Sequence, residues 1–217
     1  MSIEARPLVI ITQRVELVVS HGERRDALDQ SWATLLDTVG CDVVPIPNHP
    51  GTALALARRL KPALLILSGG NSVIPGKPDH APERNATEAA LLDWAGATGV
   101  PALGVCRGFQ FMNVYLDGKV GPVAGHVARN HAISSRTTFL EVNSYHDYGI
   151  IAGDLASPLE IVATAPDGTV EAARHRILPW IGVMWHPERA MPDTASTWSW
   201  LAALVREAAE TRRISFQ

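Results

Sequence analysis

Short apolar runs alternate with amphipathic stretches along the first half of the chain. The runs are bounded by Gly, Pro or polar residues and predict buried strands over Leu8–Thr12, Cys41–Ile46, Ala63–Leu67 and Ala102–Val105. Between them, helical periodicity predicts helices over Glu23–Val39, Thr52–Leu60, Asn85–Ala97 and Gly108–Leu116. Asn85 is expected to open its helix, with Glu88 as the capping-box partner. This alternation predicts a doubly wound α/β fold around a parallel sheet.

Beyond Asp117-Gly118 the pattern changes, because Gly, Pro and Asp turns now separate short strands without long helices between them. Strands are predicted over Thr137–Val142, Leu159–Thr164 and Thr169–Ala173. We expect them to form an antiparallel extension of the same domain. One more buried strand, Trp180–Trp185, and a closing helix, Ser196–Thr211, complete a single domain over residues 1–217.

Composition narrows the classes of function. The chain has 217 residues, 47% of them hydrophobic and 19% charged, as is typical of a globular protein. Its 19 basic and 22 acidic residues leave no positive surplus for nucleic acid. Two cysteines do not make a disulfide scaffold. The first apolar run is too short for a signal peptide, and no stretch could span a bilayer. We therefore expect a cytoplasmic protein that binds neither nucleic acid nor membrane.

The most informative stretch is Gly104-Val105-Cys106-Arg107-Gly108, where a predicted strand gives way to a helix. Two flanking glycines permit the sharp turn of a nucleophile elbow, with cysteine in place of serine. The helix N-terminus can stabilise a thiolate, and the Arg107 N–H faces the position of an oxyanion. Cys41 opens a strand without such glycines and is expected to be a packing residue.

A cysteine nucleophile needs a base and a group that orients this base. Of the eight histidines, His186 has the best context, because it ends a buried strand and precedes Pro187-Glu188. In extended chain, residues i and i+2 point the same way, so the imidazole and the Glu188 carboxylate are presented together. A turn histidine beside a surface glutamate is the structural alternative. The turn Ser68-Gly69-Gly70-Asn71, after another strand, is a second candidate oxyanion donor.

These segments, together with Val142-Asn143-Ser144-Tyr145-His146 and the form Cys-Arg-Gly-Phe-Gln, occur in the order of a known family. The chain resembles the class I glutamine amidotransferases, and in particular their stand-alone γ-glutamyl hydrolase branch. The resemblance spans roughly residues 63–189. It implies a flavodoxin-like sheet and a Cys-His-Glu triad that hydrolyses a γ-glutamyl amide through a thioester and releases glutamate.

The resemblance also implies roles for individual residues. The catalytic residues would be Cys106, His186 and Glu188, with backbone N–H groups of Gly70 and Arg107 as the oxyanion hole. Substrate-binding residues would be Gly69, Asn71, Gln110, Asn143, Ser144, Tyr145 and His146. Neither a metal nor an organic cofactor is implied. A zinc site from His80, His126, His131 and His146 is not expected, since their spacing matches no standard site and carboxylates are missing nearby.

The resemblance does not determine the identity of the amine that leaves. Polyamine or aminobutyrate conjugates are one choice, and a γ-glutamyl nucleotide phosphoramidate such as γ-glutamyl-CDP-amidate, used in surface polysaccharide modification, is another. Arg84 is expected to pair with a leaving-group phosphate, and His126 or His131 to face the leaving group. A homo-oligomer is possible. The rival interpretations are a glutaminase subunit that feeds a separate synthase, and a non-catalytic binding protein on the same fold.

Overall fold

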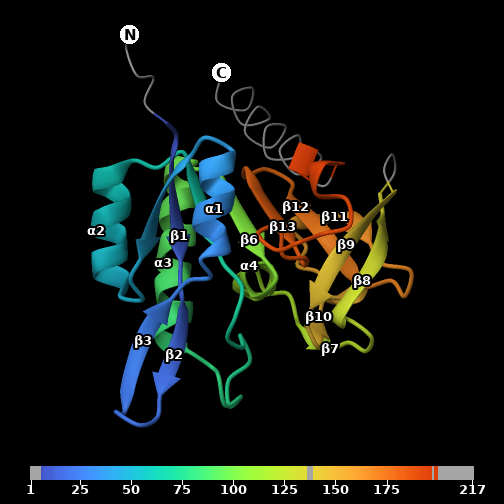
Figure 1. Ribbon diagram of the computed structural model, residues 1–217, viewed down its shortest axis with the longest axis horizontal. Coiled ribbons are helices and arrows are strands. Elements are labelled where there is room, and N and C mark those ends of the chain that lie inside the picture. Colours follow the sequence, from blue (N-terminus) through green and yellow to red (C-terminus); the bar gives the residue numbers. More distant parts are fainter. Residues whose placement is uncertain (1–5, 136–138, 197, 200–217) are drawn as a thin grey trace.

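A computed structural model of the protein describes residues 6–135, 139–196 and 198–199 (Figure 1). Its strands are β1 (Leu8–Thr12), β2 (Arg14–Val18), β3 (Glu23–Ala27), β4 (Asp42–Ile46), β5 (Leu64–Leu67), β6 (Ala102–Val105), β7 (Gly121–Pro122), β8 (Val127–Ser134), β9 (Phe139–Tyr145), β10 (Tyr148–Gly149), β11 (Leu159–Thr164), β12 (Val170–His175) and β13 (Trp180–Val183). Its helices are α1 (Ser31–Thr38), α2 (Pro50–Leu60), α3 (Pro82–Thr98), α4 (Arg107–Tyr115) and the 3₁₀ turn η1 (Ala152–Asp154).

Within the described residues, nine of these strands form one sheet in the order β4-β1-β5-β6-β13-β12-β11-β8-β9. The pairs from β4 to β13 are parallel, and those from β13 to β9 are antiparallel. Both halves of the predicted sheet are therefore confirmed. Strand β8 was not predicted, because only its last residues are buried on one face.

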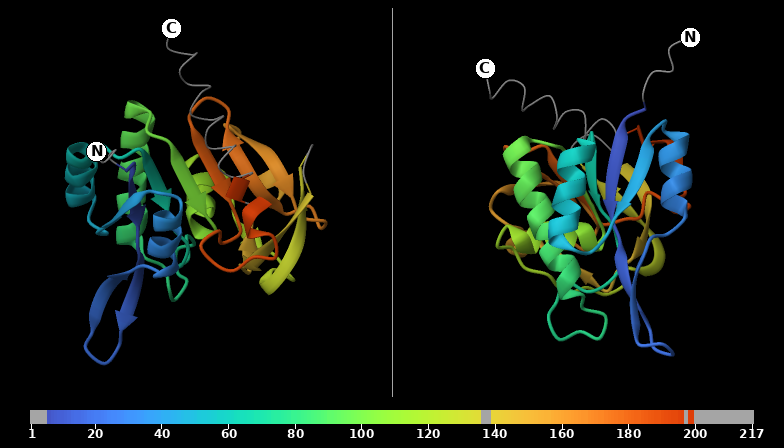
Figure 2. Two further views of the ribbon diagram at one scale, coloured as in Figure 1. Left: turned by 45° about the horizontal axis from the view of Figure 1, so that its top comes forward. Right: turned by 90° about the vertical axis from the view of Figure 1, so that its left-hand side faces the viewer.

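The parallel half is covered on both faces, as Figure 2 shows. Successive residues of β1 point to opposite faces, so Val9 and Ile11 pack in one cluster with Trp32 of α1. Ile10 packs in another with Ala53 of α2 and with residues of α3. These residues are almost completely buried, which explains why the strands are nearly continuous apolar runs.

The prediction of a helix over Glu23–Val39 is wrong in its first half. Residues Glu23–Ala27 form β3, which pairs with β2 as a separate antiparallel ribbon, and α1 begins only at Ser31. The ribbon extends away from the sheet (Figure 1). The β3 side chains are almost all exposed, so the pattern of apolar and polar residues does not distinguish a strand from a helix in this stretch. The side chain of Asn71 holds the ribbon by accepting from the N–H of Val15 and donating to its carbonyl.

Helix α3 also begins earlier than predicted. Pro82 occupies its first turn, where a missing N–H costs nothing, and Asn85 lies inside the helix. Glu88 is not a capping residue but is fully buried among charged partners that are described below. Most of the predicted closing helix Ser196–Thr211 lies outside the described residues, and so does the start of the predicted strand Thr137–Val142. Among the described helices, none has the length and apolar character needed to cross a membrane.

Candidate active site

Three adjacent parallel strands bring the predicted functional segments to one edge of the sheet. Strand β6 lies between β5 and β13 in the sheet. Leu67 is in register with Gly104, and Val183 with Val105, so the three strands end at nearly the same level. The residues that follow them therefore meet at this edge, as is usual for ligand sites in doubly wound folds.

Cys106 stands between β6 and α4 in a strained conformation. Its φ of 50° and ψ of −107° are unusual for a residue with a side chain. The turn is possible because Gly108 has no side chain, since a Cβ there would lie 2.0 Å from the carbonyl oxygen of Leu67. Arg107 is the first residue of α4, so its backbone N–H has no acceptor within the helix. The turn has the geometry of a nucleophile elbow.

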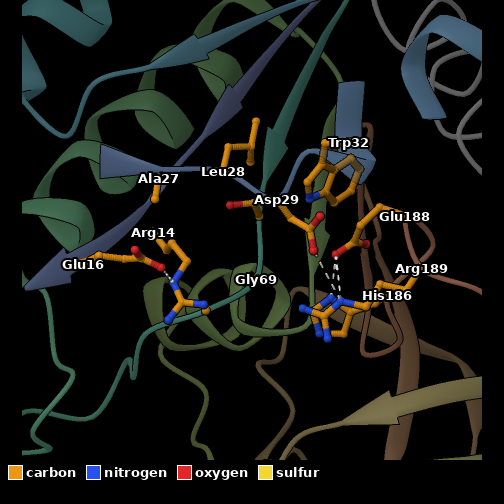
Figure 3. A pocket seen from close by; sticks show the side chains of 12 residues that line it. Arg14, Glu16, Ala27, Leu28, Asp29, Trp32, Gly69, His186, Glu188 and Arg189 are labelled. Carbon is orange, nitrogen blue, oxygen red and sulfur yellow. Dashed lines mark hydrogen bonds and ion pairs between the residues drawn. The ribbon is translucent and has the colours of Figure 1, made fainter. Parts of the chain in front are cut away.

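His186 follows β13, lies against Gly69 in the turn after β5, and is paired with Glu188. Its Nδ1 lies 2.7 Å from Oε1 of the carboxylate, and both side chains are almost fully buried (Figure 3). Burial alone would lower the pKa of His186, but interactions with Cys106 and Glu188 raise it to about 9. Gly69 allows the imidazole to approach, because a Cβ there would lie 2.7 Å from Cε1 of His186. The carboxylate thus orients the ring and favours its protonated form.

Asn143 fixes the backbone of His186 from both sides. Its Oδ1 accepts from the His186 N–H at 2.8 Å, and its Nδ2 donates to the His186 carbonyl at 2.8 Å. The asparagine is 1% exposed. The expectation that Asn143 contacts substrate is therefore corrected, because its side chain is committed to positioning the histidine. Ser144 is also buried, and its hydroxyl donates to the carbonyl of His126 at 2.6 Å, so it supports the hairpin instead.

A buried arginine holds the glycine turn that follows β5. Arg84 is 0% exposed and donates to the carbonyls of Ser68 at 2.6 Å, Gly69 at 3.0 Å and Gly70 at 2.6 Å. Within the described part of the chain it lines neither cavity at this edge. The expected contact of Arg84 with a phosphate is corrected accordingly: the guanidinium holds the turn whose residues Gly69 and Gly70 line the cavities.

The same arginine belongs to a buried charged triad with Glu88 and Arg107. The Glu88 carboxylate accepts from Arg84 at 2.9 Å, from the Arg107 guanidinium and from Oγ1 of Thr12 at 2.7 Å. Burial opposes the charged form, yet Arg107 and Arg84 hold the pKa of Glu88 below its usual range. Burial in turn lowers the pKa of Arg107 to about 10. The triad ties the glycine turn to the elbow, and only the i,i+4 spacing of Arg84 and Glu88 hinted at it.

Two neighbouring cavities open at this edge. The larger, about 360 Å³, includes Cys106, Gln110, Tyr145 and His146 in its lining. The smaller, about 220 Å³, lies on the side of Asp29 and Trp32 (Figure 3). They share the lining residues Arg14, Gly70, His186 and Arg189. The predicted oxyanion-hole residues Gly70 and Arg107 therefore lie on these cavities. So do the predicted substrate-binding residues Gly69, Asn71, Gln110, Tyr145 and His146.

The sequence did not single out the cations of these cavities. Arg14 of β2 and Arg189 after the His-Pro-Glu segment line both, and Lys77 lines the larger one. The Arg189 guanidinium stacks over Tyr145 at 4.7 Å, and this tyrosine meets the His186 ring edge-on at 5.7 Å. Arg14 reaches the site through the ribbon, whose second strand the sequence pattern predicted as helix. The location of Arg14 at the site therefore becomes apparent only from the tertiary structure.

His126 and His131 do not face the larger or the smaller cavity among the described lining residues. Their side chains turn instead toward Glu171 beneath the β8–β9 hairpin, with His146 beside them. The expectation that either faces the leaving group is corrected. His80 lies elsewhere and contacts Asn85.

This fold and site define a class of α/β protein in which a cysteine elbow and a histidine–glutamate pair share one sheet edge. Residues 25–198 match the family "glutamine amidotransferase class-I", and the chain belongs to that family. It is similar to a γ-glutamyl-CDP-amidate hydrolase from Campylobacter jejuni, with 29% identity over 181 residues that cover 82% of this chain and 88% of the relative.

Other relatives and solved structures extend the comparison. A pyrimidine-specific small chain of carbamoyl phosphate synthase from Halalkalibacterium halodurans is 29% identical over 79% of this chain, which spans only 44% of that relative. The structure of a putative GMP synthase subunit from Thermoplasma acidophilum superposes with a TM-score of 0.69 at 16% identity, covering 99% of this chain and 100% of that one. The structure of a glutamine amidotransferase from Thermotoga maritima superposes with a TM-score of 0.66 at 17% identity, covering 96% of this chain and 91% of that one. The flavodoxin-like fold prediction is confirmed.

Proposed function

We propose that the protein hydrolyses the amide bond of a γ-glutamyl compound through a covalent thioester on Cys106. The observation that carries the proposal is the strained Cys106 elbow, which lines one cavity together with His186, the partner of Glu188. The similarity to a hydrolase of this kind over most of both chains supports it.

The reaction would proceed in two steps. His186 takes the proton of the Cys106 thiol, and the thiolate sulfur attacks the γ-carbonyl carbon. The resulting oxyanion accepts hydrogen bonds from the backbone N–H groups of Gly70 and Arg107. The C–N bond breaks, and the protonated His186 gives its proton to the departing nitrogen. His186 then takes a proton from water, which attacks the thioester, and glutamate leaves as the sulfur regains the electron pair.

We further propose that the departing group carries phosphate. Arg14 and Arg189 line the boundary that both cavities share, next to His186. The Arg14 guanidinium lies 3.4 Å from the Glu16 carboxylate. Among the described residues, the ion pairs of Arg189 with Asp29 and Glu188 are longer, at 3.8 Å each. Both guanidinium groups are partly exposed, so each can donate hydrogen bonds to a further anion such as a phosphate. The similarity to a γ-glutamyl-CDP-amidate hydrolase supports this leaving group.

The test of the reaction uses purified protein with glutamine and a panel of γ-glutamyl amides, measuring glutamate release. We expect turnover of γ-glutamyl amides by the wild type and by Cys41→Ala, and none by Cys106→Ala. A γ-glutamyl-directed electrophile should label Cys106 and leave Cys41 unmodified. Turnover that survives Cys106→Ala would contradict the mechanism. Turnover of glutamine only in the presence of a synthase would favour the glutaminase subunit, and no turnover of any substrate would favour a binding protein.

The test of the leaving group compares γ-glutamyl amides of a phosphate-bearing amine and of a neutral amine. Loss of one charged contact of about 1.5–3 kcal/mol should lower kcat/KM for the phosphate-bearing substrate by roughly 10- to 100-fold in Arg14→Ala or Arg189→Ala. The neutral substrate should be affected much less. Arg24→Ala is the matched control, because this arginine pairs with Glu83 away from both cavities. Equal losses for both substrates would refute phosphate recognition.

A further inference from the structure

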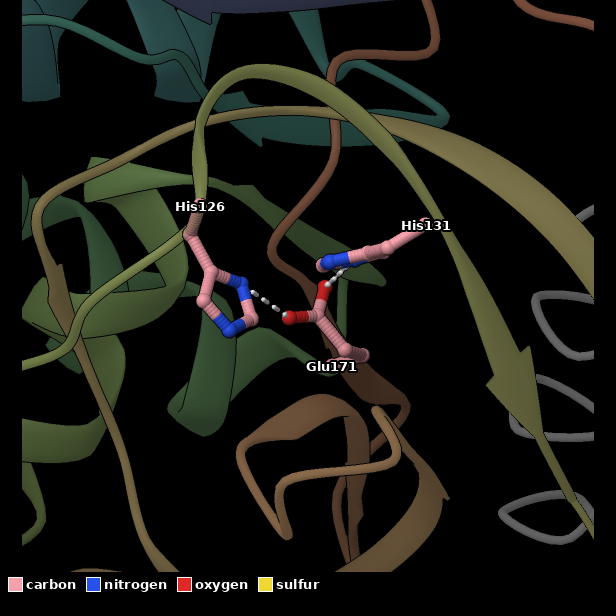
Figure 4. Close-up of side chains that lie close together, drawn as sticks. All are labelled: His126, His131 and Glu171. Atoms are coloured by element: carbon pink, nitrogen blue, oxygen red, sulfur yellow. Dashed lines mark ion pairs between the residues drawn. The ribbon is translucent and has the colours of Figure 1, made fainter.

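Four potential ligands from distant parts of the chain meet beneath the β8–β9 hairpin. His126 precedes β8, His131 lies within it, His146 follows β9, and Glu171 belongs to β12. Figure 4 shows the side chains of His126 and His131 turned toward the carboxylate of Glu171. Glu171 is 0% exposed, His126 3% and His146 4%. The sequence expectation that no carboxylate stands near these histidines is wrong, because β12 supplies one.

The atoms that face each other in this cluster have no hydrogen-bond partners. Among the described residues, Nδ1 of His126, Nε2 of His131, Nε2 of His146 and both Glu171 oxygens are buried and make no hydrogen bond. The carboxylate oxygens lie 3.4 Å from the first two nitrogens and 3.6 Å from the third. A charged hydrogen bond would be about 2.7–2.9 Å long. Five buried polar atoms without a hydrogen bond are costly, and an ion bound between them would remove this cost.

The spacing suits a metal ion. Ligand atoms that bind Zn²⁺ at about 2.0–2.2 Å in a tetrahedron are about 3.4 Å apart. One ligand atom from each of His126, His131 and Glu171 can be chosen so that all lie within 4.8 Å of one another. Neutral imidazole and carboxylate are ligands for a dication of the first transition row, while Mg²⁺ and Ca²⁺ prefer oxygen alone.

The surroundings also orient the ring nitrogens as a metal site requires. Nε2 of His126 lies 2.9 Å from Asp167, so a proton there leaves Nδ1 with a free lone pair. Nδ1 of His146 lies 3.0 Å from the carbonyl of Tyr148, so a proton there leaves Nε2 free. A carboxylate or carbonyl behind the ligating histidine is the usual outer partner in metal sites. Two of the three rings are thus held with an acceptor nitrogen toward Glu171.

We propose that His126, His131, His146 and Glu171 bind a divalent transition-metal ion, with Zn²⁺ as the best-fitting member of this class. The ion would tie the β8–β9 hairpin to β12. His146 also lines the larger cavity, and Tyr148, which it contacts, accepts from Nε2 of Gln110 at 2.7 Å. The ion would therefore act as a structural clamp on the wall of the site. This proposal does not rest on the proposed function.

The competing arrangement is a metal-free ion cluster. Without an ion, the Glu171 carboxylate raises the pKa of His126 to about 9 and keeps this histidine protonated near neutral pH. The two arrangements differ in a directly measurable way, because only one of them holds metal.

The experiment measures metal in tag-free protein purified without chelators. We expect close to one zinc ion per chain by elemental analysis. After chelation, added Co²⁺ should produce the visible absorption bands of a tetrahedral complex, and Zn²⁺ should displace them. The bands should persist in Cys106→Ser, which removes the buried thiol that could bind cobalt elsewhere. Thermal unfolding should shift upward when metal is restored.

Variants locate the ion. Glu171→Gln and His131→Asn should lower the metal content by at least about tenfold, since each removes a ligand. His21→Asn is the matched control, because this histidine is exposed and far from the cluster in sequence, and it should retain full metal content. The cobalt titration of the wild type keeps the test valid if a variant misfolds. Absence of zinc together with absence of tetrahedral cobalt bands would overturn the proposal, and so would undiminished metal in both variants.

Discussion

Removal of the Glu88 charge is predicted to destabilise the folded state strongly. The Glu88 carboxylate is fully buried between the guanidinium groups of Arg84 and Arg107. The substitution Glu88→Gln keeps the size of the side chain and an oxygen that can still accept from Thr12. It removes the charge, so two buried cations face each other without compensation. The variant therefore isolates the charge from the packing.

The magnitude follows from the burial. Breaking a buried ion pair by removing one partner costs about 3–5 kcal/mol, because the remaining charge is left in a medium that solvates it poorly. For a protein of this size, 1 kcal/mol shifts Tm by about 2–4 °C, so the expected fall is roughly 6–20 °C. The glycine turn held by Arg84 should loosen as well, and kcat/KM for glutamate release should decrease in whatever protein remains folded.

The assay is urea unfolding and thermal unfolding of Glu88→Gln beside Glu83→Gln. Glu83 stands on the same helix and also pairs with an arginine, Arg24, but their side chains are 33% and 48% exposed. An exposed pair is worth about 0–1 kcal/mol, so the control should unfold close to the wild type. If Glu88→Gln also unfolds within about 1 kcal/mol of the wild type, the reasoning about uncompensated buried charge is refuted.

Three further predictions concern the histidine. Gly69→Ala should leave the fold intact but lower kcat by at least about tenfold, because the added Cβ displaces the His186 ring; glutamate release measures it, and an unchanged kcat would contradict the contact. Asn143→Ala should destabilise the protein by about 1–3 kcal/mol and reduce kcat more than it raises KM, which urea unfolding and steady-state kinetics test. The pKa of His186 is raised from 6.5 to about 9, so its contribution to stability is fully present below about pH 6.5 and disappears as pH rises through about 9. Unfolding free energies across this window should fall less in Glu188→Gln than in the wild type, and equal slopes would contradict the pairing.

The sequence pattern alone located most strands of the main sheet and the functional segments at their ends. It could do so because parallel strands buried on both faces must be short apolar runs, and because a sharp strand–helix turn needs glycines at fixed offsets. Gly104 and Gly108 around Cys106 are such residues, and Glu188 two residues after His186 is set by the geometry of extended chain. These features are local, so they can be predicted without knowledge of the tertiary structure.

Other features depend on contacts between distant segments. The stretch Glu23–Ala27 carries helix-forming residues, yet it pairs with Arg14–Val18 because the ribbon satisfies its backbone hydrogen bonds. Glu88 has the spacing of a capping residue, and only the approach of Arg107 turns it into the centre of a buried triad. No local pattern separates these outcomes.

The roles of the remaining polar residues were likewise decided by the tertiary structure. From the sequence, Asn143 and Arg84 can be identified only as polar residues near the site. In the structure both are buried, and their side chains bind the His186 backbone and the glycine turn, respectively. Glu171 joins the histidines of the hairpin only because β12 passes beneath them. The sequence by itself therefore determined the chemistry present at the sheet edge. Long-range packing decided which polar groups reach solvent and which are consumed as support, because a buried polar atom must take the partner that the fold brings to it.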